Sequence, residues 1–146
     1  MRNANATGIA AYRNNRVVGS NPQQLVVLLY DHLLARLRRA ADQIRAGDVE
    51  GRVASLERAS DIVAELLSTL DFDAGGEIAS RLAALYAYFI GEIGAVARHP
   101  DADRLEHMTS LVASLHDSWV RAAAGEVVAG APATAMGNVD SHEDVA

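Results

Sequence analysis

Apolar residues recur at alternating steps of three and four along much of this 146-residue chain, and this spacing constrains the fold more than any other feature. Such spacing places side chains on one face of an α-helix, whereas a half-buried strand would alternate at every second residue. Two blocks show the pattern most regularly: Val53, Leu56, Ser60, Val63, Leu67 and Leu70, and then Leu105, Met108, Val112, Leu115, Trp119 and Ala122. Both blocks are predicted to be helices with a core-facing seam of coiled-coil type.

Two further apolar blocks complete the pattern. The first is predicted to run over residues 22–46, where Gly47 can stop one helix and Asp48 can cap the next. The other spans about residues 77–97, with apolar positions at Ile78, Leu82, Leu85, Phe89, Ile93 and Val96. Because short loops join the four blocks, the sequence predicts an all-α fold, an antiparallel up-down-up-down four-helix bundle over residues 21–125.

The two ends of the chain differ from this middle part. Residues 1–20 are polar and rich in Asn, yet they contain Ile9 and Tyr12, so we expect an N-terminal segment that docks on the bundle. Residues 126–146 are rich in Ala, Gly and Val and carry four carboxylates with no arginine. Without a sustained apolar period, this stretch is predicted to be a disordered acidic tail.

Composition limits the compartment and the partners. The chain contains no cysteine, which excludes disulfides and thiolate chemistry and fits a cytoplasmic location. The longest run of large apolar residues, 25–30, is far shorter than the roughly 20 residues that span a bilayer, so no membrane insertion is expected. The densest basic stretch, residues 36–45, holds four arginines but is interrupted by Asp42, and the net charge is −6. Nucleic acid is therefore not an expected partner.

Enzyme chemistry finds no support in the residue patterns. None of the five histidines follows a Glu by three residues, as the di-iron bundles require, and no Gly-x-Ser-x-Gly elbow is present. Asp103 and His107 are one helical turn apart, but two ligands do not make a metal site, and an ion pair is the simpler interpretation. We expect no catalytic residue, no metal and no cofactor. A third class of function, a ferritin-like or other bundle enzyme, would need a bound metal ion.

Several of the predicted helices carry more apolar surface than one seam. The additional stripes are Ala59, Ile62 and Leu66 in the second block and Ala79, Ala83, Tyr86 and Ile90 in the third. In one interpretation, an inner helix of a small bundle touches two neighbours and needs a broad apolar face. In the other, some stripes line a groove that accepts an amphipathic helix or an extended segment of a partner. The pattern is compatible with both.

Short motifs in a fixed order resemble a known family. They are Ala11-Tyr12, residues 20–25 (SNPQQL), residues 28–31 (LLYD), Arg58-Ala59, Ile62, Leu66, Leu70-Asp71, residues 75–79 (GGEIA), Leu82, Leu85-Tyr86 and Trp119. Together they are similar to the FliS-type flagellin export chaperones over roughly residues 9–124.

This resemblance implies a bacterial cytoplasmic bundle that binds the disordered C-terminal region of flagellin, prevents its premature polymerisation before export and catalyses no reaction. It also implies that the N-terminal segment can occupy a groove in the free state and move aside. The partner-binding residues expected on this basis are Ile9, Tyr12, Leu25, Leu28, Tyr30, Ile62, Leu66, Leu82, Leu85 and Tyr86.

The sequence leaves two other kinds of partner open. Components of the flagellar export gate are a further candidate class of partner. The alternative function is a self-associating structural or adaptor module without a flagellin client, in which the additional stripes meet a second copy in a homodimer.

Overall fold

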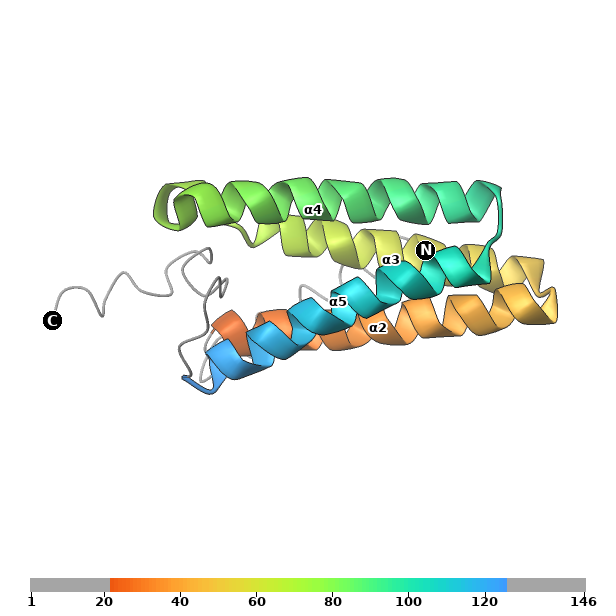
Figure 1. Cartoon of the computed structure of the whole chain (residues 1–146), viewed down its shortest axis with the longest axis horizontal. Helices are drawn as coiled ribbons and strands as arrows, with labels where there is room; N and C mark the ends of the chain where they lie inside the picture. Colours follow the sequence, from red (N-terminus) through yellow and green to blue (C-terminus); the bar gives the residue numbers. More distant parts are fainter. Residues whose placement is uncertain (1–21, 126–146) are drawn as a thin grey trace, which may run out of the picture.

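The computed structural model describes residues 22–125, which form four α-helices (Figure 1). These are α2 (Pro22–Ala46), α3 (Val49–Ser68), α4 (Phe72–Arg98) and α5 (Ala102–Ala123). Successive helices run in opposite directions along a common axis. The predicted all-α, up-down-up-down bundle is therefore confirmed. The N-terminal segment with Ile9 and Tyr12, and the acidic tail, lie outside the described residues.

The helix boundaries are set by local capping chemistry. Gly47 ends α2 with φ +73°, a left-handed conformation that favours glycine. The Asp48 carboxylate then accepts a hydrogen bond from the Gly51 amide at 2.9 Å, which caps α3 as the sequence predicts. Asp71 and Asp101 cap α4 and α5 in the same way. Aspartate caps thus fix where α3, α4 and α5 begin.

The start of α4 contains a break at Gly76. Its backbone has φ +54° and ψ −126°, so one turn of helix precedes it and the regular helix begins at Glu77. The predicted start of this helix, about residue 77, matches the regular part. A side chain with a Cβ would be strained in this conformation, since φ is positive.

The four helices do not pack equally on one another. α2 lies between α3 and α5 and makes its main contacts with both, while α4 packs mostly on α3. The contact between α4 and α5 is the smallest among the four adjacent helix pairs, and the axis of α5 diverges from that of α4 towards the C-terminal end of α5 (Figure 1). Among adjacent helices, α4 and α5 are therefore the least closely packed.

The buried face of α3 differs from the predicted seam. Val53 is exposed and Leu67 is half-buried, although both were assigned to the core-facing seam. The additional stripe is instead fully buried: Ala59, Ile62 and Leu66. The physical reason is that α3 packs on both α2 and α4, so its buried face must be wider than one seam and turned towards the stripe.

The other seams follow the sequence more closely. In α5 all six predicted positions are buried except Leu115, which is half-buried. In α4 the buried apolar positions are Ala79, Leu82, Tyr86, Phe89, Ile93 and Val96, again at alternating steps of three and four. This α4 set combines residues from the predicted seam with two from the additional stripe.

A buried aromatic cluster connects three of the helices. The hydroxyls of Tyr30 in α2 and Tyr86 in α4 are 2.8 Å apart and hydrogen-bonded, and the Trp119 ring of α5 lies 6.4 Å from the Tyr30 ring. Burial raises the pKa of Tyr30 to about 12 and also raises the pKa of Tyr86. The Trp119 Nε1 completes no hydrogen bond of good geometry, although it lies close enough to both hydroxyls to oppose these pKa shifts.

Two glycine-to-alanine substitutions in α4 should change the stability of the bundle in opposite directions. Gly76→Ala should destabilise the bundle by about 1 kcal/mol or more, because alanine is strained at φ +54°. Gly91→Ala should stabilise it by about 0.4–1 kcal/mol, because the new Cβ meets no atom within 4 Å on an exposed helix face. Urea unfolding monitored by circular dichroism measures both changes, and a destabilised Gly91→Ala variant would contradict this account.

The tyrosine pair predicts a non-additive mutant series. Tyr86→Phe leaves the Tyr30 hydroxyl buried without its partner and should reduce the free energy of unfolding by about 1–3 kcal/mol. The double variant Tyr30→Phe/Tyr86→Phe removes both hydroxyls and should lose less than the sum of the two single changes. Denaturant titrations of the three variants provide the comparison. If the two single changes in the free energy of unfolding add up to that of the double variant, Tyr30 and Tyr86 are not coupled by their hydrogen bond.

Candidate binding surface

The structure describes eight of the ten residues expected to contact a partner. Four of them are at most 2% exposed and belong to the core: Tyr30, Ile62, Leu66 and Tyr86. Leu25 and Leu82 are also buried, and Leu28 and Leu85 are half-buried. Ile9 and Tyr12 lie outside the described residues. In this arrangement Leu28 and Leu85 have the most accessible surface of the eight.

The burial of the four core residues limits how they can be tested. A carboxylate at Ile62 or Leu66 would place an unpaired charge between helices, which destabilises a core strongly. Direct contact of these side chains with a partner would require the helices to separate. A surface that is accessible in the folded bundle must use other residues.

An ion pair identifies the sides of α4 and α5 that face each other. The Arg104 guanidinium of α5 donates two hydrogen bonds to the Glu92 carboxylate of α4, at 2.7 and 2.8 Å. This pair lies close to the turn that joins the two helices. Because four residues make slightly more than one helical turn and seven make almost two, positions four, seven, eleven or fourteen residues from Glu92 or Arg104 lie on about the same sides.

These facing sides carry apolar residues that the bundle covers incompletely. We call this set the α4–α5 apolar flank: Ile78, Leu85 and Tyr88 from α4, and Leu111 and Leu115 from α5. Tyr88 is 46% exposed and Leu111 is 39% exposed, and the other three side chains are half-buried. It follows the two adjacent helices that have the smallest mutual contact, so a partner segment could bury it without displacing the core.

Sequence reasoning found only part of this flank. Leu85 was expected to bind a partner, whereas Ile78 and Leu115 were assigned to core seams. Tyr88 and Leu111 were missed because both fall outside the three-and-four pattern. Large apolar residues next to a regular seam were the available signal, but only the packing of α4 against α5 shows that they share a surface.

The Glu92–Arg104 ion pair joins α4 to α5 at one end of the flank. The hydrogen bonds from Arg104 lower the pKa of Glu92 below its ordinary value of 4.5, and His107 contributes weakly in the same direction. Arg104 in turn has a raised pKa, mainly because of the Glu92 carboxylate. The pair is charged at neutral pH and links α4 to α5 at the end opposite their divergence.

The described residues contain little that suggests other chemistry. Within residues 22–125 no group of three or more His, Cys, Asp or Glu side chains is placed to hold a metal ion. None of the four described helices has the length and hydropathy needed to cross a membrane. A helical bundle with an incompletely covered apolar flank is of the class whose surface is suited to an amphipathic segment of a partner.

Comparisons with known proteins identify the family within this class. The family described as "Flagellar protein FliS" matches residues 4–126, so the chain belongs to the FliS family. It is 33% identical over 119 residues to the flagellar secretion chaperone FliS of Campylobacter jejuni, covering 82% of this chain and 93% of that protein. The FliS chaperone of Salmonella typhimurium is 32% identical over 119 residues, covering 78% and 88%.

A more distant relative extends the similarity. The flagellar secretion chaperone FliS of Bacillus subtilis is 28% identical over 116 residues, covering 80% of this chain and 86% of that protein. The resemblance read from the short motifs is therefore confirmed, and the relatives are named as chaperones for flagellar secretion.

The Glu92–Arg104 pair predicts a pH-dependent contribution to stability. Because the folded pKa of Glu92 is lowered, the contribution is present above the unfolded carboxyl pKa and is lost as the pH falls through the folded value. Glu92→Gln should lower the melting temperature at pH 7, and its difference from the parent protein should shrink as the pH falls below about 4.

Glu77→Gln is the matched control for this measurement. Glu77 pairs with Arg81 on the same helix, and both side chains are more than three-quarters exposed, so its loss should change the melting temperature little. A Glu92→Gln effect that persists unchanged at low pH would contradict the role of the ion pair.

Proposed function

We propose that this chain is a cytoplasmic export chaperone that binds the disordered C-terminal region of flagellin and prevents its polymerisation before secretion, without catalysing a reaction. Membership of the FliS family and the names of the relatives support this role. The structural observation that carries it is the α4–α5 apolar flank, which is accessible in a bundle whose core is otherwise well buried.

The mechanism is competition for the same apolar faces. Flagellin ends that associate through amphipathic helices lose the driving force for association when those faces are already buried. A client helix lying along α4 and α5 would cover Tyr88 and Leu111 together with the half-buried residues between them. Ordering a disordered client has an entropic cost, so the buried surface must be large and mostly apolar.

Four of the ten residues expected from the family resemblance contribute to this proposal, in two roles. Leu28 and Leu85 contact the client directly, since both retain accessible surface. The N-terminal segment, through Ile9 and Tyr12, occupies the client surface in the free state and is displaced on binding. Components of the export gate would bind the loaded chaperone at a later step.

Substitutions on the flank provide the main test. Tyr88→Asp and Leu111→Asp should each weaken binding of a flagellin C-terminal peptide by about 10-fold or more, because each places a charge where apolar area is buried. Isothermal titration calorimetry measures the affinity, and circular dichroism verifies that the bundle is folded. Binding to the parent protein should also show a negative heat-capacity change.

Val53→Asp on α3 is the matched control, since Val53 is 45% exposed but lies on a helix outside the flank. Its affinity should equal that of the parent protein. Undiminished affinity in both flank variants would remove the flank from the client site. No binding of the peptide to the parent protein, combined with a dimer mass that excess peptide leaves unchanged, would favour the self-associating module.

A further inference from the structure

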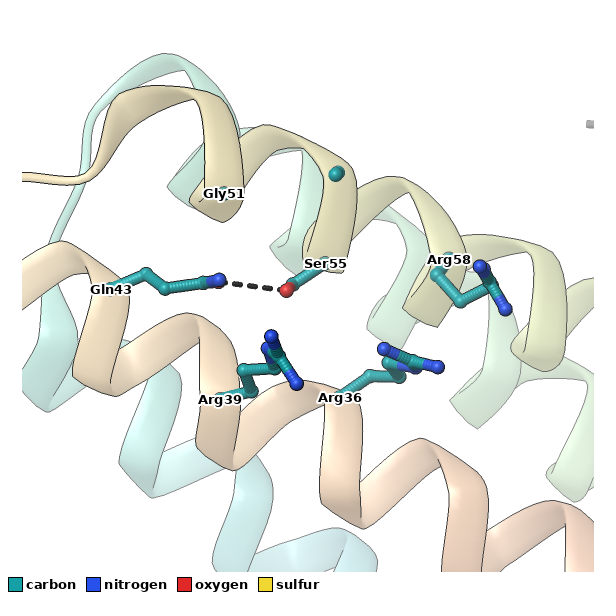
Figure 2. A pocket seen from close by; sticks show the side chains of 7 residues that line it. Arg36, Arg39, Gln43, Gly51, Ser55 and Arg58 are labelled. Atoms are coloured by element: carbon teal, nitrogen blue, oxygen red, sulfur yellow. Dashed lines mark hydrogen bonds between the residues drawn. The ribbon is translucent and has the colours of Figure 1, made fainter. Parts of the chain in front are cut away.

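A polar cleft lies between α2 and α3, on a different pair of helices from the α4–α5 apolar flank. It has a volume of about 230 Å³ and is lined by Arg36, Arg39, Gln43, Gly51, Ala54, Ser55 and Arg58. Figure 2 shows Arg36 and Arg39 extending from α2 towards α3, with Arg58 on the neighbouring helix. Three guanidinium groups thus surround one opening.

The positive charge of this cleft is not compensated within the described part of the chain. Arg36, Arg39 and Arg58 form no ion pair there, whereas Arg45 and Arg104 each pair with carboxylates of another helix. Burial lowers the pKa of Arg36, and the neighbouring charges of Arg58 and Arg39 lower it further. The three arginines therefore repel one another and would be stabilised by an anion between them.

The floor of the cleft is shaped by close packing. The Ser55 hydroxyl donates a hydrogen bond to the Gln43 Oε1 at 2.7 Å, which fixes the amide between α2 and α3 (Figure 2). Gly51 leaves room beside this amide, because a Cβ there would overlap Gln43 Nε2 and the capping carboxylate of Asp48, and these side chains would have to shift. The cleft thus presents guanidinium donors next to a hydrogen-bonded Gln43–Ser55 pair.

We propose that this cleft binds the acidic end of the chain's own C-terminal tail, through the carboxylates of Asp140, Glu143 and Asp144. These residues carry three of the four acids in residues 126–146, a stretch without arginine. Guanidinium groups bind carboxylates through paired, charge-assisted hydrogen bonds, so the two charge clusters are complementary. The proposal concerns a separate surface and does not depend on the proposed chaperone function.

The reach of the tail supports this assignment. His116 of α5 contacts Asp31 of α2 at 2.6 Å, so the antiparallel register places Gly125 beside the first turns of α2. From Pro22, which this register places beside Gly125, to Arg39 is about 17 residues of helix, or about 26 Å, and crossing α2 to reach its α3 side adds about 10 Å. About 15 residues separate Gly125 from Asp140, and a chain of that length can span at most about 50 Å. The carboxylates are therefore within reach of the cleft.

Tethering also favours the tail over a ligand in solution. A tethered group whose linker matches the distance to its site has an effective concentration in the millimolar range. The tail would therefore cover the arginines and exclude weaker anionic ligands. Because ionic contacts at the surface are screened by salt, the association should weaken as the ionic strength rises.

The absence of cysteine allows a direct measurement in the full chain. Ser141→Cys introduces a unique thiol for a nitroxide spin label between Asp140 and Glu143. In the ¹⁵N-labelled protein, the amide signals of Ala54 and Ser55 should lose intensity through paramagnetic broadening. The loss should disappear in Arg36→Gln/Arg39→Gln/Arg58→Gln and in about 1 M salt, where the screening length is about 3 Å.

The matched control is Arg38→Gln/Arg81→Gln/Arg98→Gln, which removes the same charge from exposed positions outside the cleft. Broadening at Ala54 and Ser55 should persist in this variant. No broadening in the parent protein, or broadening that survives the loss of the three cleft arginines, overturns the proposal. A mixture of spin-labelled ¹⁴N protein and ¹⁵N protein without the spin label tests for binding between molecules. Broadening at Ala54 and Ser55 in this mixture would assign the cleft to the tail of a second copy and would overturn the proposal.

Discussion

The packing of α2 against two neighbours at once is the constraint on which the rest of the bundle depends. Both sides of its apolar face are buried, one against α3 and the other against α5. α4 is then held mainly by α3, and the Glu92–Arg104 pair fastens it to α5 near their shared turn. This unequal packing leaves apolar side chains of α4 and α5 accessible beside a well-buried core.

The buried tyrosines favour one relative arrangement of α2, α4 and α5. Tyr30 and Tyr86 join α2 to α4 by a hydrogen bond across the core, and Trp119 brings α5 to the same point. A buried hydroxyl that loses its partner is unfavourable, so this contact favours one arrangement of the helices over slipped alternatives. The cluster therefore fixes α4 relative to α2 without closing the flank beside α5.

The two candidate surfaces use opposite physical chemistry and different helices. The α4–α5 apolar flank can hold a client segment by removing apolar area from water, and the α2–α3 cleft presents uncompensated arginines suited to carboxylates. Since neither surface shares a residue with the other, occupation of one does not exclude occupation of the other. A chaperone of this form could hold its client and keep its own tail bound at the same time.

Periodicity, glycines and capping carboxylates determined the helices of this protein, because a turn of helix depends on residues only a few positions apart. The boundaries at Gly47, Asp48 and Glu77 could therefore be predicted, as could the α5 seam and the family. Only the tertiary structure decided which apolar stripe is core, since Ile62 and Val53 look alike until α3 has neighbours on two sides. The grouping of Tyr88 with Leu111, and of Arg58 with Arg36, likewise arose from helix pairing, because contact across a bundle depends on rotation and register rather than on local spacing.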